Sequence, residues 1–543
     1  MKNINLQLIE AASAGNRTAV FQALQNGAYI NAVDDEKTQL TALSAACKAG
    51  HKDIAELLLQ RGAATDVCGY HESGGTPLIW AAANGDIPLA QMLLQHGADI
   101  NFQDSFEWTP LHYACHRGQT DMGLFLLEQG ANPYIKDDFD CTTLRRACYG
   151  NSTILVKRLL ELGVDPFDED IEGSSVLVSV EDAPLEIPEM LVREGLTPYS
   201  TFPWLYSTPI LRATASNNMP LIRFWRELGG DIQDLTQCDS TLVGVACAEQ
   251  NWELLPQLLE WGVDCILPDD DGFTPLMHLV ACEDVFRADC AELLLRYGTC
   301  INGEDIDDVS ILDLAATPQA REWLLAHGSR GKLQLPDELE AAVLKRYGIN
   351  DISDTQKLVD ELYLRATRPL NLDFVRAVCT ILWRRCGDDA KVVLNRTDAQ
   401  GRNLIAMQCN APGCSRKVIS YLCYAWWLGE SRKNLDSKGN SALWYALKRG
   451  NFAAAVALAY DTELLTIPGE DGTTPLQLLF GKPAPLVHEM VRRSYLDEAY
   501  KLIIKDGLSV LDRALLDAHA AGQRFLVKRF IEAGAHKEII PCP

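Results

Sequence analysis

The sequence lacks any long apolar run. A membrane-spanning helix takes roughly 18 consecutive apolar residues, and no stretch of the 543 residues approaches that length. The first residues lead straight into polar and charged side chains, without the apolar segment of a secretory signal. We therefore expect a cytoplasmic protein with reduced thiols and no membrane contact.

Positive charge is also scarce. The chain has 49 Lys and Arg against 74 Asp and Glu, a formal net charge of −25. Nucleic acids and anionic membranes would repel such a chain, so we expect neither as a ligand. The apolar content of 47% is too high for a disordered acidic tail, and the length allows three or four domains or one long array.

Sequence motifs of catalysis and of cofactor binding are missing as well. The 17 cysteines form no C-x-x-C pair, and the chain has no P-loop, no dinucleotide-binding glycine pattern and no G-x-S-x-G elbow. We therefore expect no enzyme activity, no cofactor and no metal ion.

The chain does contain a repeat. Residues 76–82 read Thr-Pro-Leu-Ile-Trp-Ala-Ala, and residues 109–115, which begin 33 positions later, read Thr-Pro-Leu-His-Tyr-Ala-Cys. Both units continue with a Leu pair and then with Gly-Ala-Asp or Gly-Ala-Asn. These residues resemble the ankyrin repeat, whose units carry such a motif at this period.

The residue types suit the helix-turn-helix unit that the resemblance implies. Thr76 can cap a helix whose first position is Pro77, where a missing N–H costs nothing. Gly85 can end that helix in a left-handed conformation. Further units follow from the position of the capping residue, which we assign to Thr41, Thr76, Thr109, Thr142, Ser174, Thr208, Thr241, Thr274 and Ser310, and then to Asn403, Ser441, Thr474 and Ser509.

We therefore predict an all-α ankyrin-repeat solenoid of helix-turn-helix units with hairpin loops, in two arrays. Residues 1–330 form an acidic N-terminal array of about ten repeats, and residues 399–543 a C-terminal array of about four. Residues 331–398 lack the motif. Apolar spacing near 3.6 residues predicts helices at 336–346, 354–366 and 372–385, as a helical insert or as divergent repeats.

His112, Cys115 and His116 lie within one helical turn, as metal ligands do. The resemblance favours another interpretation, because His112 occupies the His of the Thr-Pro-Leu-His motif, where the imidazole bonds locally. The Cys115 position is shared by other repeats as a small apolar residue of the packed helix, at Cys47, Cys148, Cys247 and Cys409.

The resemblance also implies a binding face. In ankyrin arrays, residues just before the Thr and just after the Ala pair face the concave side, and aromatic and Arg side chains are frequent interface anchors. The alternative is that these side chains pack against each other across repeats. The predicted partner-binding residues are Tyr70, His71, Phe106, Glu107, Trp108, His116, Arg117, Phe139, Asp140 and Tyr149.

The charge is divided unevenly. Residues 1–330 carry 20 Lys and Arg against 49 Asp and Glu, a net charge of −29, whereas residues 331–543 carry +4. Much of the acid falls in predicted hairpin loops, where a strip of carboxylates would attract a basic protein or simply be a solvated face. The loop acids are Asp104, Glu107, Asp137, Asp138, Asp140, Asp168, Glu169, Asp170, Glu172, Asp269, Asp270, Asp271, Glu304, Asp305, Asp307 and Asp308.

These patterns predict a non-catalytic protein-binding solenoid, monomeric when unbound, whose partner is a protein with a basic surface. A sharper version is an immunity protein, or antitoxin, that neutralises a toxin such as a nuclease. The alternatives are an adaptor or effector scaffold that recruits two proteins and, third, an enzyme with a novel site on the solenoid.

Overall fold

The computed structural model describes residues 4–34, 40–67, 75–171, 173–198, 208–233, 235–236, 238–332, 338–411, 414–424, 434–459, 462–493 and 498–540. Close contacts divide the chain into two compact units, residues 1–192 and residues 193–543. We call them unit 1 and unit 2 and describe each by itself. The predicted boundaries at 330/331 and 398/399 stay predictions.

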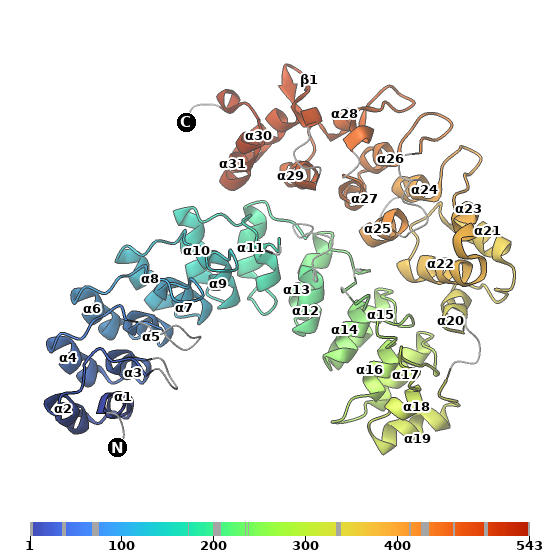
Figure 1. The fold of residues 1–543 in the computed structure, drawn as a ribbon. Helices are drawn as coiled ribbons and strands as arrows, with labels where there is room; N and C mark the ends of the chain where they lie inside the picture. The colour runs from blue at the N-terminus through green and yellow to red at the C-terminus, as the bar shows by residue number, and fades with distance from the viewer. Residues whose placement is uncertain are drawn as a thin grey trace. The chain divides into compact units, whose positions relative to one another are not determined.

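Unit 1 consists of short helices that follow one another in pairs along the chain (Figure 1). The first helices of successive pairs, α1, α3, α5, α7 and α9, pack against each other in that order. The elements are α1 (Ile4–Ser13), α2 (Arg17–Gln25), α3 (Ala42–Lys48), α4 (Lys52–Gln60), α5 (Pro77–Ala83), α6 (Ile87–Gln95), α7 (Pro110–His116), α8 (Thr120–Glu128), α9 (Thr143–Tyr149), α10 (Thr153–Leu162), the 3₁₀ helix η1 (Val176–Ser179) and α11 (Glu186–Arg193).

Unit 2 continues with helix pairs, then a group of longer helices, then pairs again. The first pairs are α12 (Pro209–Ala215), α13 (Met219–Glu227), α14 (Leu242–Ala248), η2 (Trp252–Leu254), α15 (Leu255–Glu260), α16 (Pro275–Val280), α17 (Ala288–Arg296), α18 (Ile311–Leu314) and α19 (Pro318–Ala326). The group that follows is α20 (Glu338–Arg346), α21 (Thr355–Arg365), α22 (Leu372–Cys386), η3 (Gly387–Asp389) and α23 (Ala390–Leu394).

The last part of unit 2 includes a short antiparallel strand pair, in which Ile503 lies opposite Ser509. Its elements are α24 (Leu404–Asn410), α25 (Arg416–Tyr424), α26 (Ala442–Arg449), α27 (Phe452–Ala457), η5 (Thr462–Thr466), α28 (Pro475–Leu479), α29 (Ala484–Arg493), η6 (Glu498–Lys501), β1 (Ile503–Lys505), β2 (Leu508–Ser509), α30 (Val510–Ala520), α31 (Arg524–Glu532) and η7 (Lys537–Ile539). In the part of the chain that the structure describes, no helix combines the length and apolar character that a membrane crossing requires.

The predicted capping register is confirmed at twelve of its thirteen positions, where the assigned Thr, Ser or Asn is the residue that caps a helix. The assignment of Ser174 is wrong by one residue, because Ser175 is the cap, with its hydroxyl accepting the amide N–H of Leu177. Ser175 lies 33 residues after Thr142 and 33 before Thr208, so the correction makes the period regular. The helices predicted between the arrays are confirmed as α20, α21 and α22.

Buried apolar side chains fill the space between helices, and the predicted local roles of His112 and Cys115 are confirmed. Nδ1 of His112 accepts the Thr109 amide N–H at 3.1 Å, completing a capping box. Burial lowers the pKa of His112 to about 4, so the imidazole is neutral. Burial raises the pKa of the Cys115 thiol, which packs as an apolar group, like its counterpart Cys148.

Candidate protein-binding surface

The loop before α7 is closed by its first aspartate. Oδ1 of Asp104 accepts the amide N–H of Phe106 at 2.9 Å and that of Trp108 at 3.0 Å. Its second oxygen, Oδ2, accepts the hydroxyl of Tyr113 at 2.7 Å. Both oxygens of Asp104 therefore serve the loop itself and are not free for a partner.

Asp137 closes the next loop in the same way, by accepting backbone amides. Its Oδ1 accepts the amide N–H of Phe139 at 3.0 Å and that of Cys141 at 2.9 Å. Its Oδ2 pairs with Arg146 of α9, whose Nε donates at 2.9 Å. The carboxylate of Asp137 is buried, and this pairing compensates its charge.

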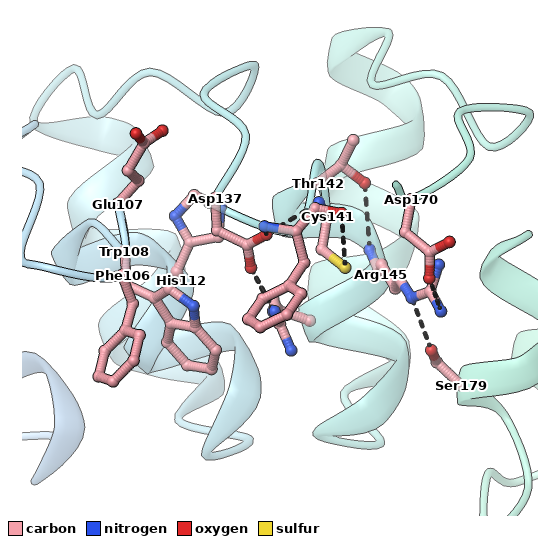
Figure 2. A network of polar contacts seen from close by, with 12 residues as sticks. Phe106, Glu107, Trp108, His112, Asp137, Cys141, Thr142, Arg145, Asp170 and Ser179 are labelled. Carbon is pink, nitrogen blue, oxygen red and sulfur yellow. Dashed lines mark hydrogen bonds and ion pairs between the residues drawn. The ribbon is translucent and has the colours of Figure 1, made fainter. Parts of the chain in front are cut away.

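A third loop is tied down by Asp170. Its carboxylate accepts the amide N–H of Ser174 at 2.7 Å and pairs with Nη2 of Arg145 at 2.8 Å. Arg145 also donates to the hydroxyl of Ser179 at 3.1 Å (Figure 2). It donates as well to the carbonyl of Ser174 at 2.8 Å. Arg145 and Arg146, neighbours on α9, thus form ion pairs with Asp170 and Asp137.

Backbone hydrogen bonds connect the tips of successive loops. The amide of Asp138 donates to the carbonyl of Phe106 at 3.1 Å, and the amide of Ile171 donates to the carbonyl of Phe139 at 3.0 Å. These bonds hold three loops side by side. We call residues 104–108, 137–141 and 168–171 the loop surface.

Three carboxylates of the loop surface, those of Glu107, Asp138 and Asp140, are exposed. The carboxylates of Glu107 and Asp140 have no hydrogen bond or ion pair among the residues that the structure describes, whereas that of Asp138 accepts its own backbone N–H. Glu107 points away from the network of contacts in Figure 2. Desolvation and repulsion by Asp137 and Asp104 raise the pKa of Asp138. The repulsion indicates a negative potential that a cation would relieve.

An aromatic cluster lies beside the loop surface. Trp108 meets Tyr113 and His116 edge to face at centroid distances of 5.0 and 5.1 Å. The guanidinium of Arg146 lies 4.2 Å from the Trp108 ring. His116 stacks on Tyr149 at 4.5 Å with the rings 6° apart. Burial, together with Arg146, lowers the pKa of His116.

The structure brings most of the predicted binding residues together in two groups. Phe106, Glu107, Trp108, Phe139 and Asp140 belong to the loop surface, while Trp108 also joins His116 and Tyr149 in the aromatic cluster.

The exposure of the predicted residues differs. Phe106, Trp108 and His116 are half-buried, whereas the side chains of Glu107, Arg117, Phe139, Asp140 and Tyr149 are exposed. Arg117 is the C-cap of α7. Tyr70 and His71 lie outside the described residues. Trp108 and His116 therefore pack across repeats, as the alternative has it. The more exposed aromatic side chains among the predicted residues are Phe139 and Tyr149, 49% and 54% exposed.

Sequence reasoning named Asp138 as a loop acid but missed two residues of this surface, Ile171 and Arg146. Ile171 follows from the period, because it lies 33 residues after Asp138 at the equivalent loop position, and it is 60% exposed. Arg146 could not be found this way, since its ring partner Trp108 is 38 residues distant in the sequence and belongs to the preceding repeat.

Capped helix pairs at a 33-residue period, joined by closed hairpin loops, define an all-α repeat solenoid. The family model "Ankyrin repeats (3 copies)" matches residues 8–104 and 98–170, so this N-terminal stretch contains ankyrin repeats. Such repeats support a protein–protein interaction role, and the family is typically non-enzymatic. A comparison with curated proteins found no match.

Proposed function

We propose that the protein is a non-catalytic solenoid that binds a basic partner protein on the loop surface of unit 1. The observation that carries the proposal is a contrast between two kinds of loop carboxylate. Asp104, Asp137 and Asp170 form hydrogen bonds or ion pairs within the protein, while Glu107 and Asp140 face solvent. The free acids are not needed to close the loops, so they are available for recognition.

Apolar contact area lies next to these charges. Phe139 and Ile171 are exposed at neighbouring loop tips, and Tyr149 is exposed at the end of α9. An interface needs such anchors, because surface ion pairs alone contribute little affinity whereas aromatic side chains often dominate it. The carboxylates would speed the encounter with a basic surface and orient it.

The finer version of this proposal is an immunity protein that holds a basic toxin, such as a nuclease, in a stoichiometric complex. Neutralisation by occlusion requires only a large complementary surface. Co-expression should then rescue cells from the toxin, and the rescue should fail when Glu107 and Asp140 are replaced by Gln and Asn.

An adaptor is the second candidate, favoured by the charge difference along the chain. Residues 331–543 carry a net charge of +4 against −29 for residues 1–330, which suits two partners of different charge. An adaptor would hold two proteins at once, whereas an immunity protein would be saturated by one.

The test begins with the full chain as bait and with the variant E107Q/D140N as matched bait. Proteins captured by both baits are background, and a partner is a protein that the variant loses. The purified partner should bind one to one, with an association rate that falls as salt rises. Equal capture by both baits, or an association rate independent of salt, would remove the loop surface from the proposal.

A further inference from the structure

The loop before α14 shows what a loop-tip carboxylate can bind. Asp239 lies two residues before the cap Thr241, at a positive φ of 54°. Its Oδ2 lies 3.6 Å from Nη2 of Arg376, a residue of α22, and the same nitrogen lies 3.5 Å from the carbonyl oxygen of Pro268. One arginine therefore spans a loop tip and the following loop.

Unit 1 presents the same backbone at Asp140. This residue also lies two positions before a capping threonine, Thr142, at a φ of 59°. The carbonyl of the preceding residue accepts an amide N–H from the next loop in both places, Phe139 from Ile171 and Cys238 from Asp270. Asp140 and Asp239 are thus equivalent positions.

Glu107 repeats the arrangement one loop earlier. It lies two residues before Thr109 at a φ of 58°, and the carbonyl of Phe106 accepts the amide N–H of Asp138. Unlike Asp239, neither Glu107 nor Asp140 has a cationic partner within the described part of unit 1. Two copies of the position are therefore open on adjacent loops.

The chemistry of the position favours arginine over lysine. A guanidinium is a planar group with five donors, so it can reach a carboxylate and a carbonyl together, whereas an ammonium is a compact point charge. In unit 1 the exposed ring of Phe139 directly precedes Asp140, and guanidinium groups also stack on aromatic faces.

We propose that this loop-tip position is a receptor for an arginine presented on a helix, filled by Arg376 in unit 2 and left to the partner's arginines at Asp140 and Glu107 in unit 1. The inference rests on the proposed function, since it names the chemistry by which the same surface holds its partner. The contact in unit 2 is loose, because both of its distances are long and Nη1 of Arg376 is buried without a hydrogen bond. A partner that is free to adjust can approach closer.

The spacing defines the partner further. Packed helices lie about 8–10 Å apart, so neighbouring loop tips recur at about that distance. Residues seven apart on one helix share a face and are separated by about 10 Å. A helix with arginines at positions i and i+7 therefore meets Glu107 and Asp140 together.

Synthetic helical peptides and the full chain test the proposal by fluorescence anisotropy. One peptide carries Arg at i and i+7 on an alanine-rich helix, a second carries Lys at the same positions, and a third carries Arg at i and i+5, on different faces. We expect the first to bind about tenfold tighter than either control. Equal binding of the Arg and Lys peptides would overturn the receptor.

Matched variants of the chain locate the contact. Asp140→Asn and Glu107→Gln should each weaken the first peptide, and the pair together should reduce it to the level of the Lys peptide. Asp138→Asn removes the same charge from the same loop, away from the receptor position, and should leave the preference for Arg intact.

If Asp138→Asn weakens binding of the first peptide as much as Asp140→Asn does, only the general negative charge matters. That result overturns the receptor and leaves the proposed function standing. If the unmodified chain binds none of the peptides and captures no partner that the E107Q/D140N variant loses, both the receptor and the proposed function are overturned.

Discussion

Two buried aspartates, Asp137 of unit 1 and Asp264 of unit 2, have different surroundings. Asp137 of unit 1 has Arg146 on one oxygen and two amide N–H donors on the other. Asp264 of unit 2 accepts the amide N–H of Ile266 at 2.9 Å, but its Oδ2 is buried without a hydrogen bond. The first charge is compensated and the second is not.

The uncompensated aspartate marks the place where α20 and α22 meet the array. Burial, followed by repulsion from Asp373 of α22, raises the pKa of Asp264 to about 7, although Arg376 and Arg346 act in the opposite direction. Asp373 is itself buried, with Arg346 at 3.3 Å and the Tyr347 hydroxyl at 3.0 Å. Around Asp264 the buried charges are therefore less well matched than around Asp137.

The largest expected effect comes from breaking the compensated pair. Arg146→Ala leaves Asp137 charged and buried, and it removes the cation above the Trp108 ring. We expect unit 1 to lose about 3–5 kcal/mol of stability. Hydrogen exchange followed by mass spectrometry should show faster exchange in α7 and α9, with unit 2 unchanged. Unaltered protection in α9 would contradict the assigned role.

Removing the charge of Asp264 is expected to raise stability, whereas removing Arg146 lowers it. Burial and Asp373 raise the pKa of Asp264 from 3.8 to about 7, and the pKa of Asp373 is raised as well. The folded pair therefore holds a proton that the unfolded chain releases in this range. Unit 2 should therefore lose stability as the pH rises through this window, with no further loss above it. Asp264→Asn keeps the oxygen that accepts the Ile266 amide and removes the charge.

We expect Asp264→Asn to stabilise unit 2 at pH 8 by about 2–4 kcal/mol and to have little effect at pH 4. Exchange protection of α14 and α16, corrected for the intrinsic pH dependence of exchange, measures the difference. A variant that is less stable than the parent at pH 8 would show that the carboxylate is compensated after all.

A smaller difference separates two capping threonines. The Thr109 hydroxyl accepts an amide N–H in a full capping box, whereas the Thr208 hydroxyl makes no cap hydrogen bond. Thr109→Ala should cost about 0.5–2 kcal/mol, and Thr208→Ala less than about 0.5 kcal/mol. Local exchange in α7 and α12 compares the two substitutions, and equal losses would contradict the difference in capping.

The smallest effect on folding is expected at the exposed loop tip. Phe139→Ala removes a half-exposed ring and keeps the backbone that bonds to Ile171, so stability should change by less than about 0.5 kcal/mol. Affinity for the captured partner should fall by about tenfold or more, because aromatic anchors dominate interfaces. Surface plasmon resonance would measure it, and unchanged affinity would exclude Phe139 from the interface.

The sequence alone predicted the features that depend on residues close together in the chain. The capping register was predictable because, at every confirmed position except Thr208, the Thr, Ser or Asn side chain accepts an amide N–H within three residues. It failed at Ser174, where two serines stand together and only the 33-residue period distinguishes them. The half-buried state of Trp108 could not be predicted, since Arg146 lies in another repeat. The encounter of Asp264 with Asp373 depends on how α22 packs, over a separation of 109 residues.

The hydrogen bonds between loop tips have a consequence for how the surface can change. The carbonyls of Phe106 and Phe139 and the amides of Asp138 and Ile171 hold adjacent loops through main-chain atoms alone. Every amino acid except proline has both a main-chain N–H and a carbonyl, so these hydrogen bonds do not depend on the side chains at these positions. New binding specificities can arise there by single substitutions without a loss of fold, which makes the loop surface the natural place to retarget this scaffold.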